Sequence, residues 1–106
     1  MVKQYDIYWV NLDPNVGSEI KKTRPCIVIS PNVSNNLLNT LLIAPITSTL
    51  RNFPMRLNIE LKGKTGQIAL DQICCIDQIR LLGKMDSLEK ISISKLKSIL
   101  SEYLIE

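Results

Sequence analysis

The 106-residue sequence contains no histidine, and its three cysteines are an odd number. Without histidine, a Ser–His–Asp triad and the commonest zinc sites are excluded. An odd count argues against a disulfide framework, and neighbours such as Cys74 and Cys75 point to opposite faces of a strand, so they do not readily hold one metal. We therefore expect no metal, no cofactor and three reduced, mostly buried thiols, with Cys26 inside an apolar run.

Long apolar runs and strong charge are also missing. No stretch approaches the roughly 18 apolar residues of a membrane helix, and residues 1–6 lack the apolar core of a signal peptide. The net charge of +3 is far below that of proteins that coat nucleic acid non-specifically. We expect a single domain over residues 1–106, located in the cytoplasm without membrane attachment.

Several segments have the length and composition of β-strands. Residues 5–12 suit a strand, and the apolar runs 25–30 and 41–46 are typical of central strands covered on both faces. Residues 55–61 alternate between apolar and polar, which indicates a strand with one solvent face. The shorter segments predict strands at 67–70 and 73–76, a loop or single helical turn at 33–40, and strand or helical turn at 78–82.

Turn and helix signals complete the prediction. Gly63 and Gly66 bracket an expected hairpin turn, and the β part is expected to end near Gly83. A C-terminal amphipathic helix is expected, with Ser92 or Ser94 as its N-cap; its apolar stripe starts at Leu96 and continues with Ile99, Leu100, Tyr103 and Leu104. The sequence therefore predicts a mainly β (α+β) fold with a C-terminal amphipathic helix.

A basic cluster precedes the second predicted strand and includes Lys21, Lys22 and Arg24. Arginine is always charged, and its planar fork of donors matches two phosphate oxygens at once. Pro25 restricts Arg24 to extended geometry at the entrance of the strand. The residues support two interpretations equally: a phosphate-binding arginine, or a structural ion pair between Arg24 and Glu19.

Two hydroxyl residues, Thr47 and Ser48, follow the third predicted strand. Hydroxyls at a strand end can donate to a phosphate oxygen or simply cap a turn. From the residues alone, the capping interpretation is the commoner one.

Six short motifs give the chain a resemblance to the MazF/PemK toxins of bacterial toxin–antitoxin systems. They occur in the family's order and spacing and are Asp6-Ile7-Tyr8-Trp9-Val10, Gly17-Ser18-Glu19, Thr23-Arg24-Pro25, Ser30-Pro31, Pro45-Ile46-Thr47-Ser48 and Asp71-Gln72. The resemblance implies an SH3-like β-barrel of the type shared by these toxins and the gyrase poisons. It also implies a homodimeric, metal-independent, sequence-specific endoribonuclease that is silenced by an antitoxin protein. Such enzymes cut single-stranded RNA by attack of a 2′-hydroxyl on the adjacent phosphate.

The resemblance places the family's functional arginine and threonine at Arg24 and Thr47, and its loop carboxylate at Glu19. We expect Arg24 to stabilise the phosphorane, Thr47 to hold a non-bridging oxygen, and Glu19 to act as general base. The remaining residues expected to contact substrate are Ser18, Lys21, Lys22, Ser48, Arg51, Asn52, Phe53, Asp71 and Gln72. Phe53 could instead fill the core, and core positions are expected for Tyr8 and Trp9.

One departure from the family concerns Cys74 and Cys75, which stand where many members carry a basic residue followed by Ser or Thr. This difference is expected to affect RNA preference more than activity. Two other functions remain open. One is a gyrase poison, although proteins with that activity carry a C-terminal Trp-Gly-Ile signature that this chain lacks. The other is a barrel that binds RNA or a protein tail without catalysing a reaction.

Overall fold

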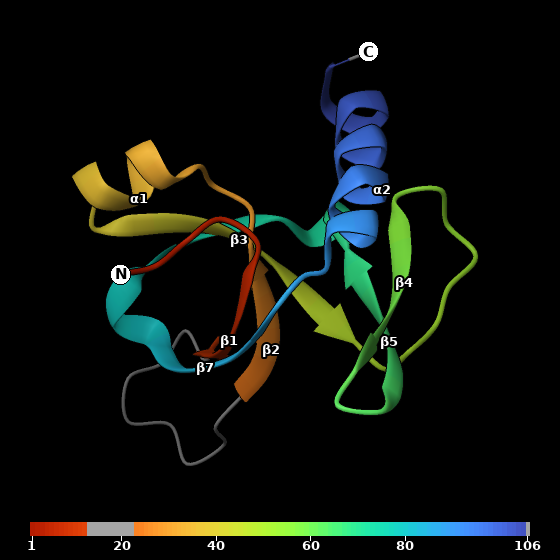
Figure 1. The fold of residues 1–106 in the computed structure, drawn as a ribbon, viewed down its shortest axis with the longest axis horizontal. Coiled ribbons are helices and arrows are strands. Elements are labelled where there is room, and N and C mark those ends of the chain that lie inside the picture. The colour runs from red at the N-terminus through yellow and green to blue at the C-terminus, as the bar shows by residue number, and fades with distance from the viewer. Residues whose placement is uncertain (13–22, 106) are drawn as a thin grey trace.

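The computed structural model describes residues 1–12 and 23–105. These residues form a curled, antiparallel seven-stranded sheet with the strand order β4-β5-β3-β2-β1-β7, and β6 pairs with β3 beside this path. The strands are β1 (Asp6–Asn11), β2 (Thr23–Val28), β3 (Thr40–Thr47), β4 (Arg56–Leu61), β5 (Lys64–Ala69), β6 (Cys74–Asp77) and β7 (Leu81–Ser87). Figure 1 shows the β4–β5 hairpin standing apart from the β1–β2–β7 side of the sheet.

Helices connect and cover the strands. They are α1 (Asn32–Leu37), the short 3₁₀ turns η1 (Leu70–Gln72) and η2 (Gln78–Arg80), the long helix α2 (Lys90–Leu100), and a terminal π-helical turn η3 (Ser101–Ile105). In Figure 1, α2 stands over the top of the β4–β5 hairpin, and η3 continues it to the C-terminus. The expected mainly β fold with a C-terminal helix is confirmed.

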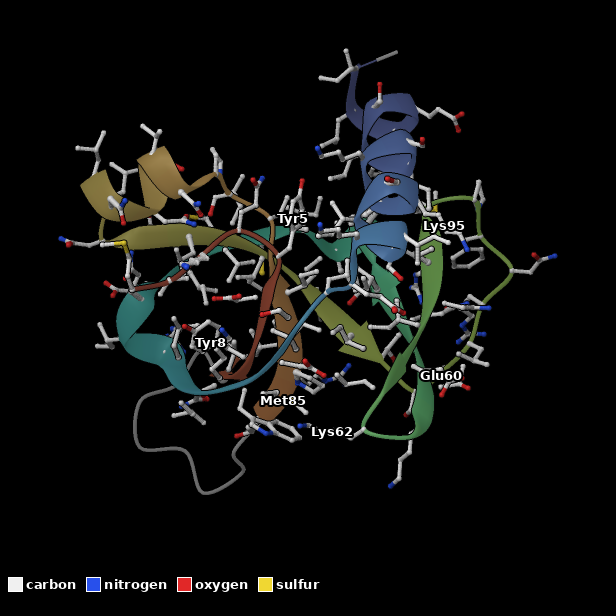
Figure 2. All side chains as sticks on the ribbon, in the orientation of Figure 1. Tyr5, Tyr8, Glu60, Lys62, Met85 and Lys95 are labelled. Atoms are coloured by element: carbon white, nitrogen blue, oxygen red, sulfur yellow. The ribbon has the colours of Figure 1, made fainter. Side chains whose placement is uncertain are left out.

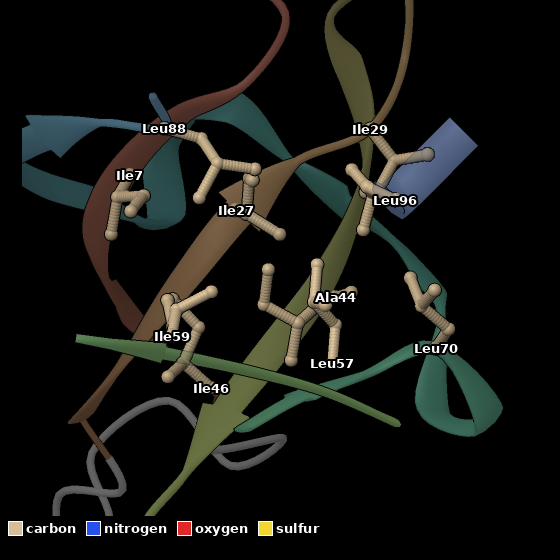
Figure 3. Packing of buried hydrophobic residues seen from close by; sticks show 11 residues of the cluster. Ile7, Ile27, Ile29, Ala44, Ile46, Leu57, Ile59, Leu70, Leu88 and Leu96 are labelled. Carbon is tan, nitrogen blue, oxygen red and sulfur yellow. The ribbon is translucent and has the colours of Figure 1, made fainter. Parts of the chain in front are cut away.

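Two apolar clusters lie on opposite faces of the central strands. Ile27 of β2 belongs to the larger cluster, which also contains Leu96 of α2 and is drawn in Figure 3. Its neighbours along the strand, Cys26 and Val28, belong to the second cluster. Because successive side chains of a strand point to opposite faces, only a strand covered on both sides needs a continuous apolar run. This arrangement explains the composition of residues 25–29.

The boundaries of the later elements correct the sequence prediction. Strand β7 continues to Ser87, four residues past the expected end at Gly83. Helix α2 begins at Lys90 with Glu89 as its N-cap, so the expected N-cap at Ser92 or Ser94 is wrong. Only Leu96 of this helix is fully buried, so its first turns carry little of the apolar stripe that marks a helix in a sequence.

The hairpin turn between β4 and β5 also differs from the expectation. It consists of Lys62 and Gly63, both with positive φ, 53° and 78°. Gly66 lies inside β5 and is buried. A Cβ atom at Gly66 would come within 3.1 Å of the Ile46 side chain, so this glycine permits close approach of β3 and does not form a turn.

Candidate functional site

The third strand divides its hydrogen bonds between two parts of the sheet. It pairs with β2 from Ile43 to Pro45, where the partner of Pro45 is Cys26. The next two residues, Ile46 and Thr47, pair instead with Ile68 and Gln67 of β5. Strands β2 and β3 therefore separate immediately after Pro45, and the sheet opens at this point.

Arg24 and Thr47 lie on the two sides of this opening. If the β2–β3 register continued by two more residues, Arg24 would be the partner of Thr47. Arg24 keeps its pairing with Val10 of β1 on the other edge of β2, but on the β3 side the strands diverge and a cleft of about 550 Å³ opens. Both residues line this cleft, together with Ser48. The divergence thus brings the sequence-predicted arginine and hydroxyls to one site.

Arg24 is exposed and lines this cleft, and it forms no ion pair with a carboxylate of residues 1–12 and 23–105. Its conformation follows from its place in β2 before Pro25, which favours extended backbone. The alternative partner Glu19 lies outside the described residues. The same holds for the predicted contacts Ser18, Lys21 and Lys22, and their roles stay predictions.

The hydroxyl of Thr47 caps a turn, as one of the two interpretations of the sequence expected. Its oxygen accepts a hydrogen bond of 3.1 Å from the backbone N–H of Thr49, which caps the turn after β3. A hydroxyl that accepts can still donate its own proton, because it has one donor and two acceptor sites. The turn therefore fixes Thr47 while leaving its proton available to a ligand in the cleft.

The connection from β3 to β4 is held on the outer face of the hairpin. The side-chain amide of Gln67 accepts from the backbone N–H of Arg51 at 3.0 Å and donates to its carbonyl oxygen at 2.9 Å, and a further bond of 2.8 Å reaches Asn58. The ring of Phe53 lies 5.3 Å from the guanidinium carbon of Arg56. Arg51, Asn52 and Phe53 are exposed and do not line the cleft.

Asp71 is engaged by an arginine that the sequence prediction missed. Its carboxylate accepts two hydrogen bonds from Arg56, at 2.6 Å from Nε and 3.1 Å from a terminal nitrogen. These bonds hold the pKa of the Asp71 carboxyl below its ordinary value. Gln72 beside it is exposed. Asp71 thus links β4 to η1, and no signal in the sequence connects it to an arginine fifteen residues earlier.

Two further predictions about side chains are wrong. Trp9 was expected in the core, but it is 41% exposed and lines the cleft, whereas Tyr8 packs against the second apolar cluster as expected. Cys26 is buried, but Cys74 and Cys75 are exposed. Both lie on the short strand β6, which among the described strands pairs only with β3. One edge of β6 therefore has no neighbouring strand in the described part of the chain to shield these thiols.

The opposite wall of the cleft was also missed. It is formed by the β4–β5 hairpin through Lys62, Lys64 and Thr65, while Met85 of β7, a strand that pairs with β1, also lines the cleft. No sequence pattern connects these positions to Arg24, because the divergence of β2 from β3 is what places them together. Within the described ranges no group of three or more Cys, Asp or Glu residues is arranged to hold a metal ion. No helix among them is long and apolar enough to cross a membrane.

Comparisons with known proteins agree with the fold. A family model described as the PemK-like, MazF-like toxin of type II toxin-antitoxin system matches residues 3–104. The endoribonuclease EndoA of Bacillus subtilis (strain 168) is 30% identical over 92 residues, which are 87% of this chain and 79% of that protein.

Solved structures share the fold at lower identity. An endoribonuclease in complex with its cognate antitoxin from a Mycobacterial species superposes with a TM-score of 0.83 at 17% identity, covering 98% of this chain and 95% of that one. The MazE–MazF complex of Deinococcus radiodurans gives a TM-score of 0.81 at 21% identity, covering 97% and 95% of the two chains. The MazF-type fold expected from the sequence is confirmed, and the chain belongs to the PemK-like, MazF-like toxins of type II toxin–antitoxin systems.

Proposed function

We propose that this chain is an endoribonuclease toxin that cleaves single-stranded mRNA at specific sequences without a metal ion. The observation that carries the proposal is the position of Arg24 opposite Thr47 where β2 and β3 diverge. A cation with a bidentate fork and a hydroxyl donor on two sides of one cleft suit a phosphate whose charge grows during reaction. The endoribonuclease function of the relative EndoA supports the same reaction class.

The proposed reaction is an internal transfer. The 2′-oxygen attacks the adjacent phosphorus and loses its proton to a base, while the bond from phosphorus to the 5′-oxygen breaks and that oxygen gains a proton. Arg24 stabilises the phosphorane and the leaving oxygen, and Thr47, with Ser48 in support, donates to a non-bridging oxygen. Glu19 is the proposed general base, and a carboxylate close to Arg24 would be a weak one, so a modest rate is expected.

The partners follow from the same family. The mycobacterial and Deinococcus radiodurans relatives were solved with antitoxins, and we propose that a cognate antitoxin protein also neutralises this chain. We further propose that the toxin acts as a homodimer in the cytoplasm. The remaining substrate contacts proposed from the sequence, including Arg51, Asn52, Phe53 and Gln72, would then be reached by RNA that extends beyond the cleft.

The direct test incubates the purified toxin with a long RNA in EDTA and maps the new 5′ ends. Discrete cuts within one short sequence are expected. Arg24→Lys keeps the charge but loses the fork, so we expect cleavage to fall by about 10²–10³-fold at an unchanged melting temperature. Intact RNA with the native protein, or near-native cleavage by Arg24→Lys, would refute the proposal.

A further inference from the structure

The cleft is larger than one phosphate requires. Its volume of about 550 Å³ falls within the roughly 300–1,000 Å³ typical of sites for whole small molecules. Arg24 and Thr47 line it where β2 and β3 diverge, and the tip of the β4–β5 hairpin lines another part. In Figure 2, Lys62 at this tip is drawn next to Met85, and both residues line the cleft. The hairpin side therefore has room for a part of the substrate other than the reacting phosphate.

The hairpin tip carries two cations, Lys62 and Lys64, and both are exposed. Neither forms an ion pair with a carboxylate of the described residues. The nearest carboxylate along the hairpin, Glu60, accepts a hydrogen bond of 2.8 Å from the hydroxyl of Thr65. Two unpaired positive charges on one wall of a cleft are an attractive environment for phosphate.

The backbone of Lys62 adds an independent indication. Its φ of 53° lies in the left-handed region, which lysine rarely adopts and which Asn or Gly occupies more readily in a two-residue hairpin turn. Strained residues of this kind persist where the surrounding structure or a function requires them. The strain costs stability, and the charge that it places at the edge of the cleft is a functional reason to retain it.

An aromatic side chain lies on the facing wall. Trp9 of β1 is flanked by its register partners Pro25 and Gly83 and is 41% exposed. A Cβ atom built on Gly83 would meet nothing within 4 Å, so this side of the wall is open. Exposed aromatic rings in single-strand binding proteins stack on bases with little sequence preference.

We propose that Trp9, Lys62 and Lys64 form a nucleotide subsite beside the scissile phosphate. The Trp9 ring stacks on the base of a neighbouring nucleotide, and the two lysines neutralise the phosphates that flank it. This inference rests on the proposed ribonuclease function, because it assigns further residues that line the same cleft. It adds affinity and register to the RNA strand without contributing to bond cleavage.

Lysine substitutions test the charge of the subsite. Lys62→Asn removes the charge and suits the positive φ, so the turn is preserved. Lys64→Gln removes the second charge within the strand, and Lys95→Gln on α2 is the matched control, since Lys95 is exposed and does not line the cleft. Binding is measured with a mixed-sequence single-stranded RNA that carries 2′-methoxy groups and cannot be cut. The sequence's single tryptophan, Trp9, reports binding directly by its fluorescence.

The salt dependence of binding distinguishes a phosphate contact from general weakening. For single strands, log K falls linearly with log salt, and each lost phosphate contact reduces the steepness of that fall by about 0.7. We expect this decrease for Lys62→Asn and for Lys64→Gln, about twice as much for the double variant, and none for Lys95→Gln. Unchanged slopes in the double variant would overturn the assignment.

Trp9 is tested with labelled RNA, because its own signal is lost on substitution. Trp9→Phe keeps an aromatic face and should bind nearly as well as the wild type. Trp9→Leu keeps apolar bulk without the face, and we expect about 5- to 150-fold weaker binding, the equivalent of one base stack. Equal binding by Trp9→Leu and wild type at equal melting temperature would contradict the stacking role.

The outcomes separate this inference from the function on which it rests. RNA cleavage that needs Arg24 but is indifferent to Trp9, Lys62 and Lys64 in affinity and salt slope would refute the subsite alone. A wild-type protein that neither binds nor cuts RNA would refute both. If the lysine variants bound RNA normally but lost affinity for an acidic peptide, the wall would belong to a protein partner, and the inference would be wrong.

Discussion

At the scale of single residues, position in the sheet decides the reactivity of a thiol. Cys26 of β2 is buried in the second apolar cluster. This burial, and to a smaller extent the nearby Cys74, raises the pKa of its thiol to about 12, although Arg24 acts in the opposite direction. Burial also raises the pKa of the Cys74 thiol, and Cys75 raises it further. Because the thiolate is the reactive form, these thiols should differ widely in rate.

A chromogenic disulfide reagent at pH 8 tests this difference. We expect Cys75 to react first, Cys74 more slowly, and Cys26 only after unfolding in denaturant. The variants Cys74→Ala and Cys75→Ala assign the two early phases. A native protein in which all three thiols react at one rate would show that Cys26 is not protected by the core.

The ion pair of Asp71 with Arg56 predicts a dependence of stability on pH. The side chain of Arg56 is 6% exposed, so removing its partner charge leaves a buried cation with weaker compensation. We expect Asp71→Asn to lower the free energy of unfolding at pH 7 by about 1–3 kcal/mol in urea titrations.

The lowered pKa of Asp71 determines the pH at which the difference in stability between wild type and Asp71→Asn disappears. The pKa of Asp71 is lowered in the folded protein, so the carboxylate stabilises the fold above its ordinary value of 3.8, and this contribution is lost as the pH falls through the lowered folded value. Wild type and Asp71→Asn should therefore converge in stability between about pH 4 and the lower folded pKa. A constant difference down to pH 2 would contradict the assignment.

At the scale of elements, the β3–β4 connection depends on one side chain. Gln67 replaces the backbone of a neighbouring strand by pairing with both the N–H and the carbonyl of Arg51. A loop held in this way is ordered before substrate arrives, which reduces the entropy lost on binding.

Hydrogen exchange at the Arg51 amide tests the contribution of Gln67. In Gln67→Leu we expect exchange to accelerate at least about fivefold, the equivalent of a bond of about 1 kcal/mol. Asn58→Ala removes only a neighbour of Gln67 and should leave the rate nearly unchanged. An unaltered rate in Gln67→Leu would mean that other contacts hold the loop.

Helix α2 is attached to the sheet mainly through Leu96. This side chain is fully buried in the larger cluster, so Leu96→Ala should cost about 2–5 kcal/mol of unfolding free energy. The exposed neighbour Lys95 provides the control, and Lys95→Gln should stay within about 0.5 kcal/mol. Equal effects of the two substitutions in thermal unfolding would exclude this mode of attachment.

A comparison of predicted and observed elements shows which parts of the fold the sequence pattern predicts. Strands β1 to β4 were predicted close to their bounds, because apolar runs and period-2 alternation follow directly from burial. Strand β7 was cut short because its residues are mostly exposed, so they carry no burial pattern. Motif order pointed to Arg24 and Thr47, which line the cleft, whereas Lys62 and Trp9 were missed as cleft residues because their place depends on where two strands separate.

At the scale of the whole molecule, several apolar side chains remain in solvent around α1 and η2. Leu37, Leu42 and Ile79 are 78%, 43% and 82% exposed, and the side-chain amide of Gln78 joins the two elements by donating to the carbonyls of Asn35 and Leu38. Exposed apolar surface of this kind favours association.

The proposed homodimer can be examined on this surface. We expect light scattering to give twice the mass of one chain, and Leu42→Glu to shift the protein toward the monomer at low micromolar concentration. Lys95→Gln should leave the mass unchanged. If Leu42→Glu remained a dimer with the same dissociation constant, the homodimer would have to use another face.

The separation of β2 from β3 has a consequence for engineering this fold. Two more ladder pairs would bring Arg24 and Thr47 into register and should raise stability, as added backbone hydrogen bonds usually do. The same two pairs would close the cleft in which these residues meet. Selection for thermal stability alone would therefore be expected to yield toxins that are harmless to the cell.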